Sequence, residues 1–384
     1  MTALEPTEED LIFKRVLQRL SKTPYACSSL SQLSTRPANF VFRGVLAQPI
    51  HTQDGAAGTI IIKHSTDPHA SYQAFEESLL NALARFTALD IATSIVITTP
   101  RLCLFDRETD IQVLEDFTGT DGFKWVLYSA NADKLLPQPS PALIGRQLGS
   151  WLRSFHEWTS APEQAALRAQ MWQNDPMRKV KYGYTYGSFL PVLENYPELL
   201  DGYRETLETI RDAIAKEFEK SSTESGDSWG LVHGDFWTGN ILIPTTPWRE
   251  PPVADETNKL FIIDWEFAQF GHRSYDLGQI VGDLYERKVF NDNAAGISTM
   301  EGVINGYGKL SDEMAFRTAI YVGVHLIGWY KRRPQKVIPP EIIVAGLTIG
   351  RDFIIKGWEK DRKFFEGSGL ASLFVVNDRG VTKS

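Results

Sequence analysis

This sequence has few cysteines, no long apolar runs and no excess of positive charge. Only two cysteines occur, Cys27 and Cys103, which are far apart and lack zinc-site spacing. This excludes a disulfide-stabilised scaffold and indicates free thiols in a reducing compartment. The longest apolar stretches, such as residues 318–329, fall short of the ~20 residues of a membrane span. The formal net charge of −8 argues against a nucleic-acid-binding surface, which would be basic.

Signals for export are missing as well. The first residues are acidic and lack the basic start and the apolar core of a signal peptide. The sequence also contains no Asn-x-Ser/Thr glycosylation acceptor. We therefore expect a cytoplasmic protein whose partners include neither nucleic acid nor a membrane.

The apolar pattern changes character along the chain. Runs rich in β-forming residues occur at 39–46 and 59–63, whereas helical spacing dominates later, for example at 143–158 and 199–218. A β-rich part followed by a helical part predicts an α+β fold. The two lobes are expected at residues 1–116 and 117–384.

The most informative segment is residues 231–242. An apolar pair there leads into His233 and Asp235, and Asn240 follows five residues after the aspartate. A second apolar run then leads into Asp264. Phosphoryl transfer needs one carboxylate to orient a hydroxyl, and oxygen ligands for magnesium, because catalysis is mostly positioning and charge neutralisation. The pattern therefore predicts an ATP-dependent kinase.

Segment 233–240 resembles the catalytic loop of the aminoglycoside phosphotransferase and choline kinase superfamily. Segment 264–278, which contains Asp-Trp-Glu and Tyr-Asp-Leu-Gly, is similar to the branch that includes methylthioribose kinase and fungal 4-hydroxytryptamine kinase. The resemblance spans about residues 33–329, which is most of the chain. It implies a bilobal protein-kinase-like fold with ATP between the lobes.

The resemblance also implies roles for the catalytic loop. Asp235 would be the base that accepts or orients the substrate hydroxyl. Asn240 and Asp264 would hold Mg²⁺, which prefers oxygen ligands. Glu266 would either join them or serve as a structural carboxylate near the metal. His233 is assigned to the catalytic group, with a buried scaffold hydrogen bond as the alternative.

Two further residues are expected to support this loop rather than react. Asp276 resembles the family aspartate that braces the catalytic loop from below. His156, at the end of an apolar helical pattern, is expected to form part of the core under the same loop.

Nucleotide-binding residues are implied in the N-terminal lobe. Lys63 ends an isoleucine-rich strand and matches the kinase lysine that contacts the α and β phosphates; the alternative is a surface lysine. Its helix partner is expected to be Glu76, although Glu77 is adjacent. Glu115 and Phe117 lie where family members bind adenine, and Glu115 could instead form a hinge salt bridge.

The predicted phosphate-covering loop departs from the family pattern. Related sequences tend to carry a Gly-Gly pair before Ala-Asn-Phe-Val, whereas residues 33–40 contain no glycine. Glycine lets a backbone approach phosphates closely, so this loop is expected to cover them less tightly. Arg36 and Asn39 are the candidates for phosphate contact here, with a solvent-facing Arg36 as the alternative.

The acceptor pocket is expected to combine aromatic and charged side chains. Phe236 and Trp237 follow Asp235 directly, while His325 and Trp329 are one turn apart on an apolar helix, and Asp283 lies on the helix after Tyr-Asp-Leu-Gly. Such a set suits a flat, cationic, hydroxylated amine through cation–π and ion-pair contacts. Ordinary core packing is the alternative.

Three functions remain open at this point. The first is a small-molecule kinase that uses ATP and Mg²⁺ to phosphorylate a hydroxyl of a small metabolite. Methylthioribose kinase is the main alternative within that class, and a catalytically silent kinase-like nucleotide-binding protein is the alternative outside it. A protein kinase is less favoured, because Asp-Trp-Glu stands where protein kinases have Asp-Phe-Gly.

Overall fold

The structure of the chain is a computed structural model. It describes residues 8–36, 39–52, 55–66, 72–86, 95–219, 228–249, 252, 257–291, 293–330 and 338–375. The chain forms two compact units. The first comprises residues 1–85 and 99–120, and the second comprises residues 86–98 and 121–384.

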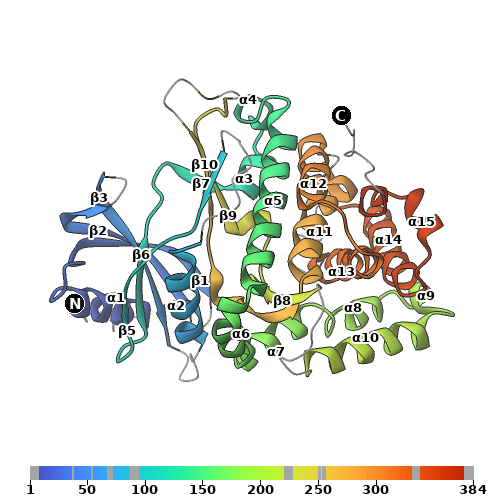
Figure 1. Ribbon diagram of the computed structural model, residues 1–384, viewed down its shortest axis with the longest axis horizontal. Coiled ribbons are helices and arrows are strands. Elements are labelled where there is room, and N and C mark those ends of the chain that lie inside the picture. Colours follow the sequence, from blue (N-terminus) through green and yellow to red (C-terminus); the bar gives the residue numbers. More distant parts are fainter. Residues whose placement is uncertain are drawn as a thin grey trace, which may run out of the picture. The chain divides into compact units, whose positions relative to one another are not determined.

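The first unit is built on a five-stranded antiparallel sheet with the strand order β1-β2-β3-β6-β5 (Figure 1). Its elements are α1 (Glu8–Leu20), β1 (Cys27–Arg36), β2 (Asn39–Thr52), β3 (Gly55–Ser65), α2 (Tyr72–Leu83), β5 (Leu102–Asp106) and β6 (Ile111–Glu115). The strands predicted at 39–46 and 59–63 are confirmed as parts of β2 and β3. Strand β1 was not predicted, because its serine-rich sequence carries no apolar alternation.

Alternation along β3 separates its side chains onto two faces of the sheet. Ile60 and Ile62 are buried in a core that also contains Val16 from α1. Lys63 points to the other face, where α2 supplies Glu76. The strand pattern thus places Lys63 beside a helix instead of in solvent.

The second unit is mainly helical. Its helices are α3 (Phe123–Tyr128), α4 (Ala132–Leu135), α5 (Ser140–Ser160), α6 (Ala165–Trp172), α7 (Asp175–Tyr184), α8 (Phe189–Leu193), α9 (Pro197–Leu200), α10 (Arg204–Phe218), α11 (Ser274–Asn291), α12 (Ala294–Tyr307), α13 (Asp312–Tyr330), α14 (Pro340–Trp358) and α15 (Arg362–Glu366). Its short 3₁₀ turns are η1 (Pro162–Gln164), η2 (Thr238–Asn240), η3 (Trp265–Phe267) and η4 (Ala371–Leu373). None of the described helices is long and apolar enough to cross a lipid bilayer.

Two small sheets carry the loops of the second unit. The strands are β4 (Ile95–Thr98), β7 (Thr120–Gly122), β8 (Trp229–Val232), β9 (Ile241–Pro244), β10 (Asn258–Ile262) and β11 (Gln269–His272). β10 is parallel to β4 and antiparallel to β9, in a sheet of order β4-β10-β9-β7. β8 and β11 form a separate antiparallel pair.

One predicted helix is interrupted. The helix expected at 143–158 is confirmed as part of α5, whereas the helix expected at 199–218 is split between α9 and α10. Gly202 lies in the break with φ of +74°, a left-handed conformation that ends a helix. The prediction of one continuous helix at 199–218 was wrong for this reason.

Helices α5 and α12 approach one another closely enough for their backbones to touch. A Cβ atom added at Gly149 of α5 would lie 2.0 Å from the carbonyl oxygen of Val303 on α12. The glycines at this crossing are Gly145 and Gly149 on α5, and Gly302 and Gly306 on α12. The crossing brings His156 of α5 and Tyr307 of α12 together, with 2.9 Å between His156 Nδ1 and the tyrosine hydroxyl.

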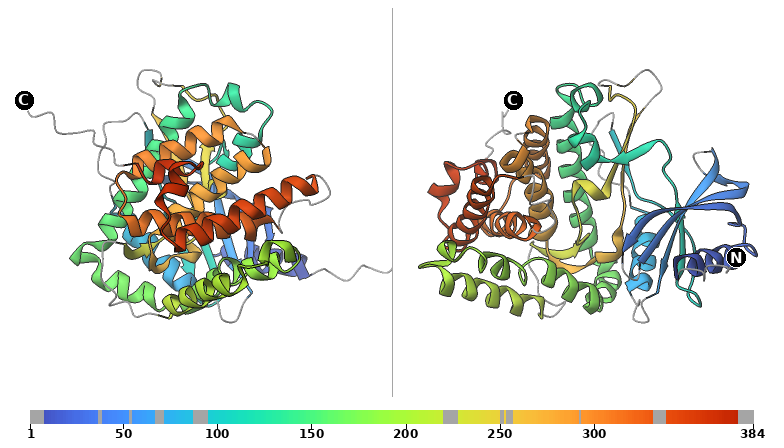
Figure 2. Two further views of the ribbon diagram at one scale, coloured as in Figure 1. Left: turned by 90° about the vertical axis from the view of Figure 1, so that its right-hand side faces the viewer. Right: turned by 180° about the vertical axis from the view of Figure 1, so that it is seen from behind.

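The helices after residue 274 pack on one another, with α13 against both α11 and α14 (Figure 2). Tyr321, Val324 and Ile327 of α13 belong to the same buried cluster as Leu347 and Ile354 of α14. Tyr275 of α11 belongs to the same cluster, so this apolar packing also supports α11.

Burial of His272 on β11 predicts a pH-dependent stability. Burial lowers the pKa of His272 to about 4, against about 6.5 in an unfolded chain. Between these values the unfolded chain binds a proton that the folded protein does not, so stability falls as the pH drops from about 6.5 to about 4. We expect His272 to contribute up to about 3 kcal/mol to this loss, at about 1.4 kcal/mol per pH unit.

Denaturant unfolding of His272→Asn across this pH range checks the expectation. Asparagine can keep the contact that the Ser274 backbone N–H makes with His272 Nδ1 at 3.2 Å. The variant should therefore lose less stability than the wild type on acidification. The exposed His51 provides the control, and His51→Asn should leave the pH dependence unchanged. The same slope in wild type and His272→Asn would contradict the assignment.

Candidate active site

The predicted catalytic loop, residues 233–240, begins where β8 ends. Gly234 has φ of +81°, and a Cβ atom there would lie 2.1 Å from the carbonyl oxygen of Phe267. Both the backbone conformation and the close approach require glycine at this position. The turn at Gly234 separates His233, which lies in the core, from Asp235, which is partly exposed.

One face of α11 holds this loop at three points. Asp276, Gln279 and Asp283 are spaced i, i+3 and i+7, so they lie on the same side of the helix. Asp276 accepts hydrogen bonds from the backbone N–H groups of His233 and Gly234, at 2.8 and 2.9 Å. Gln279 contacts the loop at Asp235, and Asp283 contacts it at Thr238.

The carboxylate of Asp235 accepts hydrogen bonds from three side chains. Gln279 Nε2 donates to Oδ1 at 2.6 Å. Asn240 Nδ2 and Trp237 Nε1 donate to Oδ2 at 2.8 and 3.2 Å. These donors fix the rotation of the carboxylate, which is what orienting an acceptor hydroxyl requires.

Asp283 is buried below the other end of the loop. It accepts from the hydroxyl and the backbone N–H of Thr238, and its ion pair with Arg287 is 3.3 Å long. Burial alone would raise the pKa of Asp283, but Arg287 and His325 outweigh it and hold the pKa below its usual value. The carboxylate expected to bind a cationic substrate is therefore engaged inside the protein.

His233 has both ring nitrogens on backbone groups. Its Nδ1 accepts from the Asp235 N–H at 3.2 Å, and its Nε2 lies 3.0 Å from the carbonyl oxygen of Ile263. Burial lowers the pKa of His233, which favours the neutral ring with the proton on Nε2. These contacts match the scaffold alternative for His233.

The brace at Asp276 continues into the core. His156 Nε2 lies 3.0 Å from Asp276 Oδ2, and both side chains are completely buried. Burial alone would raise the pKa of Asp276, but the contacts with His156 and His233 hold it below its usual value. The α5–α12 crossing, through His156 and Tyr307, thus supports an ionised carboxylate under the loop.

Sheet register brings Asn240 and Asp264 to one edge. Ile241 on β9 pairs with Ile262 on β10, and the Ile263 N–H donates to the Asn240 carbonyl at 3.0 Å. Asp264 follows directly and has φ of +67°, a left-handed conformation that aspartate and asparagine tolerate better than most residues. Asn240 and Asp264, whose side chains both carry oxygen atoms, therefore lie at neighbouring ends of the paired strands β9 and β10.

This edge fits a magnesium ion bound with the help of a phosphate ligand. Asn240 uses its amide nitrogen on Asp235, which leaves its amide oxygen as the group that can face a cation. Glu266, also buried, is in the 3₁₀ turn that follows Asp264. No three His, Cys, Asp or Glu side chains converge into a metal site in the part of the chain that the structure describes. Mg²⁺ commonly takes one or two protein carboxylates and completes its shell with water and phosphate.

The predicted acceptor residues have different environments. Phe236 is completely buried and stacks on Trp151, so it belongs to the core. Trp237 is partly exposed, and Lys124 Nζ lies 4.7 Å from the centre of its ring. His325 is buried on α13, 3.2 Å from Glu286. Trp329 is in α13, but its side chain lies outside the described residues.

In the first unit, Lys63 Nζ donates to Glu76 Oε1 at 2.9 Å, and this pair connects β3 to α2. The neighbouring Glu77 instead contacts Arg107. Both members of the Lys63–Glu76 pair are mostly buried, with 14% and 2% of their side chains exposed. Lys63 is therefore not a solvent-exposed lysine at a strand end, which was the alternative for this residue.

Three of the remaining nucleotide candidates lie at strand ends, and Phe117 lies between β6 and β7. Glu115, the last residue of β6, forms a salt bridge with Arg101 at 3.3 Å. This contact matches the alternative role for Glu115, that of a salt-bridge partner at the hinge. The carbonyl oxygen of Phe117 accepts from the Thr120 hydroxyl at 2.6 Å. Arg36 ends β1 and Asn39 begins β2, but their side chains are outside the described residues.

Several residues of this site were missed in the sequence. Gln279 follows Asp276 by one helical turn, so helical spacing could have indicated it. Thr238 is within the segment 233–240 and Arg287 follows Asp283 by one helical turn, so local spacing could have indicated both. Lys181 reaches the site only through the tertiary fold, and no local pattern marks it.

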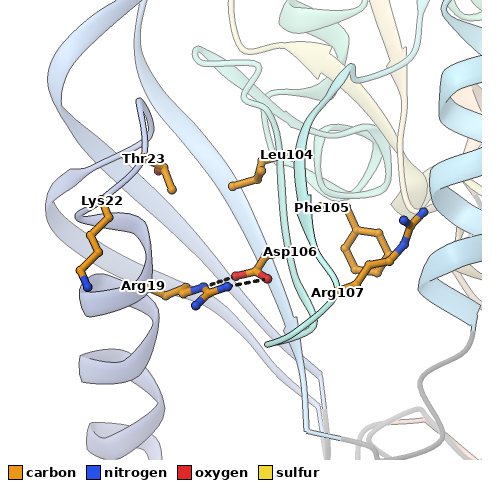
Figure 3. A pocket seen from close by; sticks show the side chains of 7 residues that line it. All are labelled: Arg19, Lys22, Thr23, Leu104, Phe105, Asp106 and Arg107. Carbon is orange, nitrogen blue, oxygen red and sulfur yellow. Dashed lines mark hydrogen bonds and ion pairs between the residues drawn. The ribbon is translucent and has the colours of Figure 1, made fainter.

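A surface pocket of about 490 Å³ in the first unit contains none of these candidates (Figure 3). Arg19 there is paired with Asp106 and Glu108. Arg107 lies on the other side of the strand, over the ring of Phe105. The lining residues are Arg19, Lys22, Thr23, Leu104, Phe105, Asp106 and Arg107. Two of the lining cations, Arg19 and Arg107, are already paired with carboxylates, and the pocket is not part of the site described above.

Comparison with known proteins settles the family. The model of the phosphotransferase enzyme family matches residues 44–317, which include β3, the catalytic loop and α11. The chain belongs to this family. A phosphotransferase called FrzJ from Cladobotryum sp is 32% identical over 378 residues, with 93% of this chain and 94% of that protein covered. A 4-hydroxytryptamine kinase from Psilocybe cyanescens is 22% identical, with 97% and 93% covered.

A solved structure gives the same fold. The amicoumacin kinase hAmiN, in complex with AMP-PNP and Ca²⁺, superimposes with a TM-score of 0.54 at 13% identity, covering 91% of this chain and 94% of that one. The predicted membership of the phosphotransferase superfamily, the enzyme class and the α+β protein-kinase-like fold are confirmed.

Proposed function

We propose that this phosphotransferase is an ATP-dependent small-molecule kinase that uses Mg²⁺ to transfer the γ-phosphate to a hydroxyl group. The observation that carries the proposal is the Asp235 carboxylate, held by three donors next to the strand edge of Asn240 and Asp264. A kinase needs an oriented carboxylate and a magnesium-binding edge in the same place. We propose residues 1–116 as the nucleotide-binding lobe and 117–384 as the catalytic and substrate-binding lobe.

The side chains divide the work of the reaction. Asp235 orients the acceptor hydroxyl and takes up its proton. At the same time a new bond forms between the acceptor oxygen and the γ-phosphorus, and the bond from that phosphorus to the leaving ADP breaks. Asn240 and Asp264 would hold Mg²⁺, which neutralises phosphate charge when bound. Glu266 remains a candidate at that edge. Lys63, oriented by Glu76, is proposed to contact the nucleotide phosphates.

The acceptor is proposed to be a small hydroxylated metabolite. Relatives named 4-hydroxytryptamine kinase support this class. Trp237, which is partly exposed beside Asp235, is the aromatic candidate for stacking against the acceptor. His325 is buried, so we propose it only as a second candidate for contact with the acceptor. Because Arg287 already neutralises Asp283, an ammonium group on the acceptor would have to be recognised elsewhere.

Phosphate transfer from ATP to a panel of phenols, hydroxylated amines and sugars tests the proposal directly. We expect phosphorylation of at least one acceptor in the panel, and we expect this phosphorylation to require Mg²⁺. Phosphorylation of an acceptor that requires neither ATP as the donor nor the divalent ion would contradict it. Methylthioribose belongs in the panel, because it distinguishes the main alternative.

Asp264→Asn provides a sharp test of the metal edge. Asparagine tolerates the left-handed backbone at this position but lacks the charge, so the fold should remain while metal-dependent nucleotide binding weakens. In the wild type, AMP-PNP with Mg²⁺ at a hundredfold excess over its Kd should stabilise the protein by about 2.7 kcal/mol. We expect most of this stabilisation to be lost in Asp264→Asn, as measured by thermal unfolding.

A matched control is available in the first unit. Asp110 also has a positive φ, of +51°, and no role in the site is proposed for it. Asp110→Asn should keep the full metal-dependent shift. An unchanged shift in Asp264→Asn would remove Asp264 from the metal site.

A further inference from the structure

A buried lysine lies behind the catalytic carboxylate. Lys181 on α7 is only 4% exposed, and its ammonium group donates to Gln279 Oε1. The same ammonium lies 5.5 Å from the centre of the Tyr321 ring. The hydroxyl of Tyr321 approaches Gln279 Oε1 as well, at 3.5 Å.

Helix α7 is anchored next to the catalytic region. Asn174, directly before the helix, donates from its amide to the carbonyl oxygen of Ala268 at 2.9 Å, and α7 packs against the turn η3. Near its other end, the Thr185 hydroxyl donates to the Lys181 carbonyl at 2.7 Å. The position of Lys181 is therefore fixed by contacts on both sides of it.

The lysine determines which way the Gln279 amide faces. A glutamine amide has an accepting oxygen and a donating nitrogen, and it can be rotated to exchange them. An ammonium group can only donate, so it requires the oxygen on its own side. The amide nitrogen must then face Asp235 Oδ1, to which it donates at 2.6 Å. The reverse orientation would set two donors against each other at Lys181 and two acceptors against each other at Asp235.

We propose that Lys181 is a positioning residue for phosphoryl transfer: it fixes the orientation of Gln279, which in turn holds the Asp235 carboxylate toward the acceptor hydroxyl. This inference rests on the proposed function, because it assigns Asp235 as the group that orients the acceptor. Lys181 itself acts through Gln279 and touches no reacting atom in this arrangement.

A double-mutant cycle tests the inference. Lys181→Met and Gln279→Met replace each side chain by an apolar one of similar length, and the double variant completes the cycle. We expect each single variant to lower kcat by roughly 10- to 100-fold, since small displacements of a reacting group have effects of this size. KM for ATP should change by less than about twofold, and the double variant should match Gln279→Met alone.

A neighbouring lysine supplies the control. Lys179 is on the same helix, but its side chain is 81% exposed and pairs with Asp175. Lys179→Met should leave kcat unchanged. Wild-type kcat in Lys181→Met, or losses that simply multiply in the double variant, would overturn the proposal.

A further variant covers the case in which Lys181→Met does not fold. Gln279→Glu keeps a partner for Lys181 but places an acceptor against Asp235, so the fold should persist while kcat falls at least as far as in Gln279→Met. Wild-type turnover in Gln279→Glu would overturn the proposal. Asp235→Asn, assayed beside these variants, separates the two claims: if only Asp235→Asn is inactive, the role of Lys181 is refuted and the proposed function stands.

Discussion

Replacement of Asp235 by asparagine is expected to lower kcat roughly 10²- to 10⁴-fold, the usual range for the loss of a positioned general base. The variant keeps the shape of the side chain but loses a charge and an acceptor. Its amide nitrogen must face either Gln279 or the pair Asn240 and Trp237, all of which are donors. We therefore also expect a stability loss of about 1–3 kcal/mol from the unsatisfied contact.

Steady-state turnover and calorimetric binding of AMP-PNP with Mg²⁺ measure these effects separately. Nucleotide affinity should stay close to the wild-type value, because Asp235 is assigned to the acceptor. Asp133→Asn, an exposed aspartate at the start of α4, should leave both quantities unchanged. Turnover near the wild-type level in Asp235→Asn would remove it from the role of base.

Removal of the buried brace at Asp276 is expected to have the largest effect on stability. Asp276→Ala leaves two backbone N–H groups and His156 without their acceptor inside the core. Breaking a buried, hydrogen-bonded charge network costs about 3–5 kcal/mol. For a chain of 384 residues we expect this loss to lower Tm by about 4–6 °C.

An aspartate in the first turn of another helix serves as the control. Asp312 begins α13, but its side chain is 72% exposed and its partner Arg362 is also on the surface. Asp312→Ala should cost about 1 kcal/mol or less, the range of surface ion pairs. Comparable losses of unfolding free energy in the two variants would show that the contacts with His233 and Gly234 contribute little.

Much of the fold was predictable because it depends on local patterns. The alternation of Ile60 and Ile62 placed β3 and turned Lys63 away from the core that they form. The segment from His233 to Asn240 and the resemblance that it carries led to the protein-kinase-like fold. Predictions failed where one residue changed the local conformation, as Gly202 does between α9 and α10.

The environment of the site was less accessible from the sequence. Asp283 was expected to meet a cationic substrate, but Arg287, one turn later, neutralises it, and Thr238 also binds it. Phe236 was expected at the substrate because it adjoins Asp235, yet it turns into the core onto Trp151. Contacts such as Lys181 to Gln279 join residues 98 positions apart, and only the folded chain shows them.

The spacing of Asp276, Gln279 and Asp283 along α11 has a consequence for how this family can vary in length. Each helix residue turns the next side chain by about 100°, so a single insertion between these positions would rotate the later contacts off the catalytic loop. A deletion within residues 233–240 would shift the loop against the same three side chains. Evolutionary insertions and deletions should therefore be confined to places such as the segment between β9 and β10, and a correct alignment of relatives should open no gap in either the loop or the first half of α11.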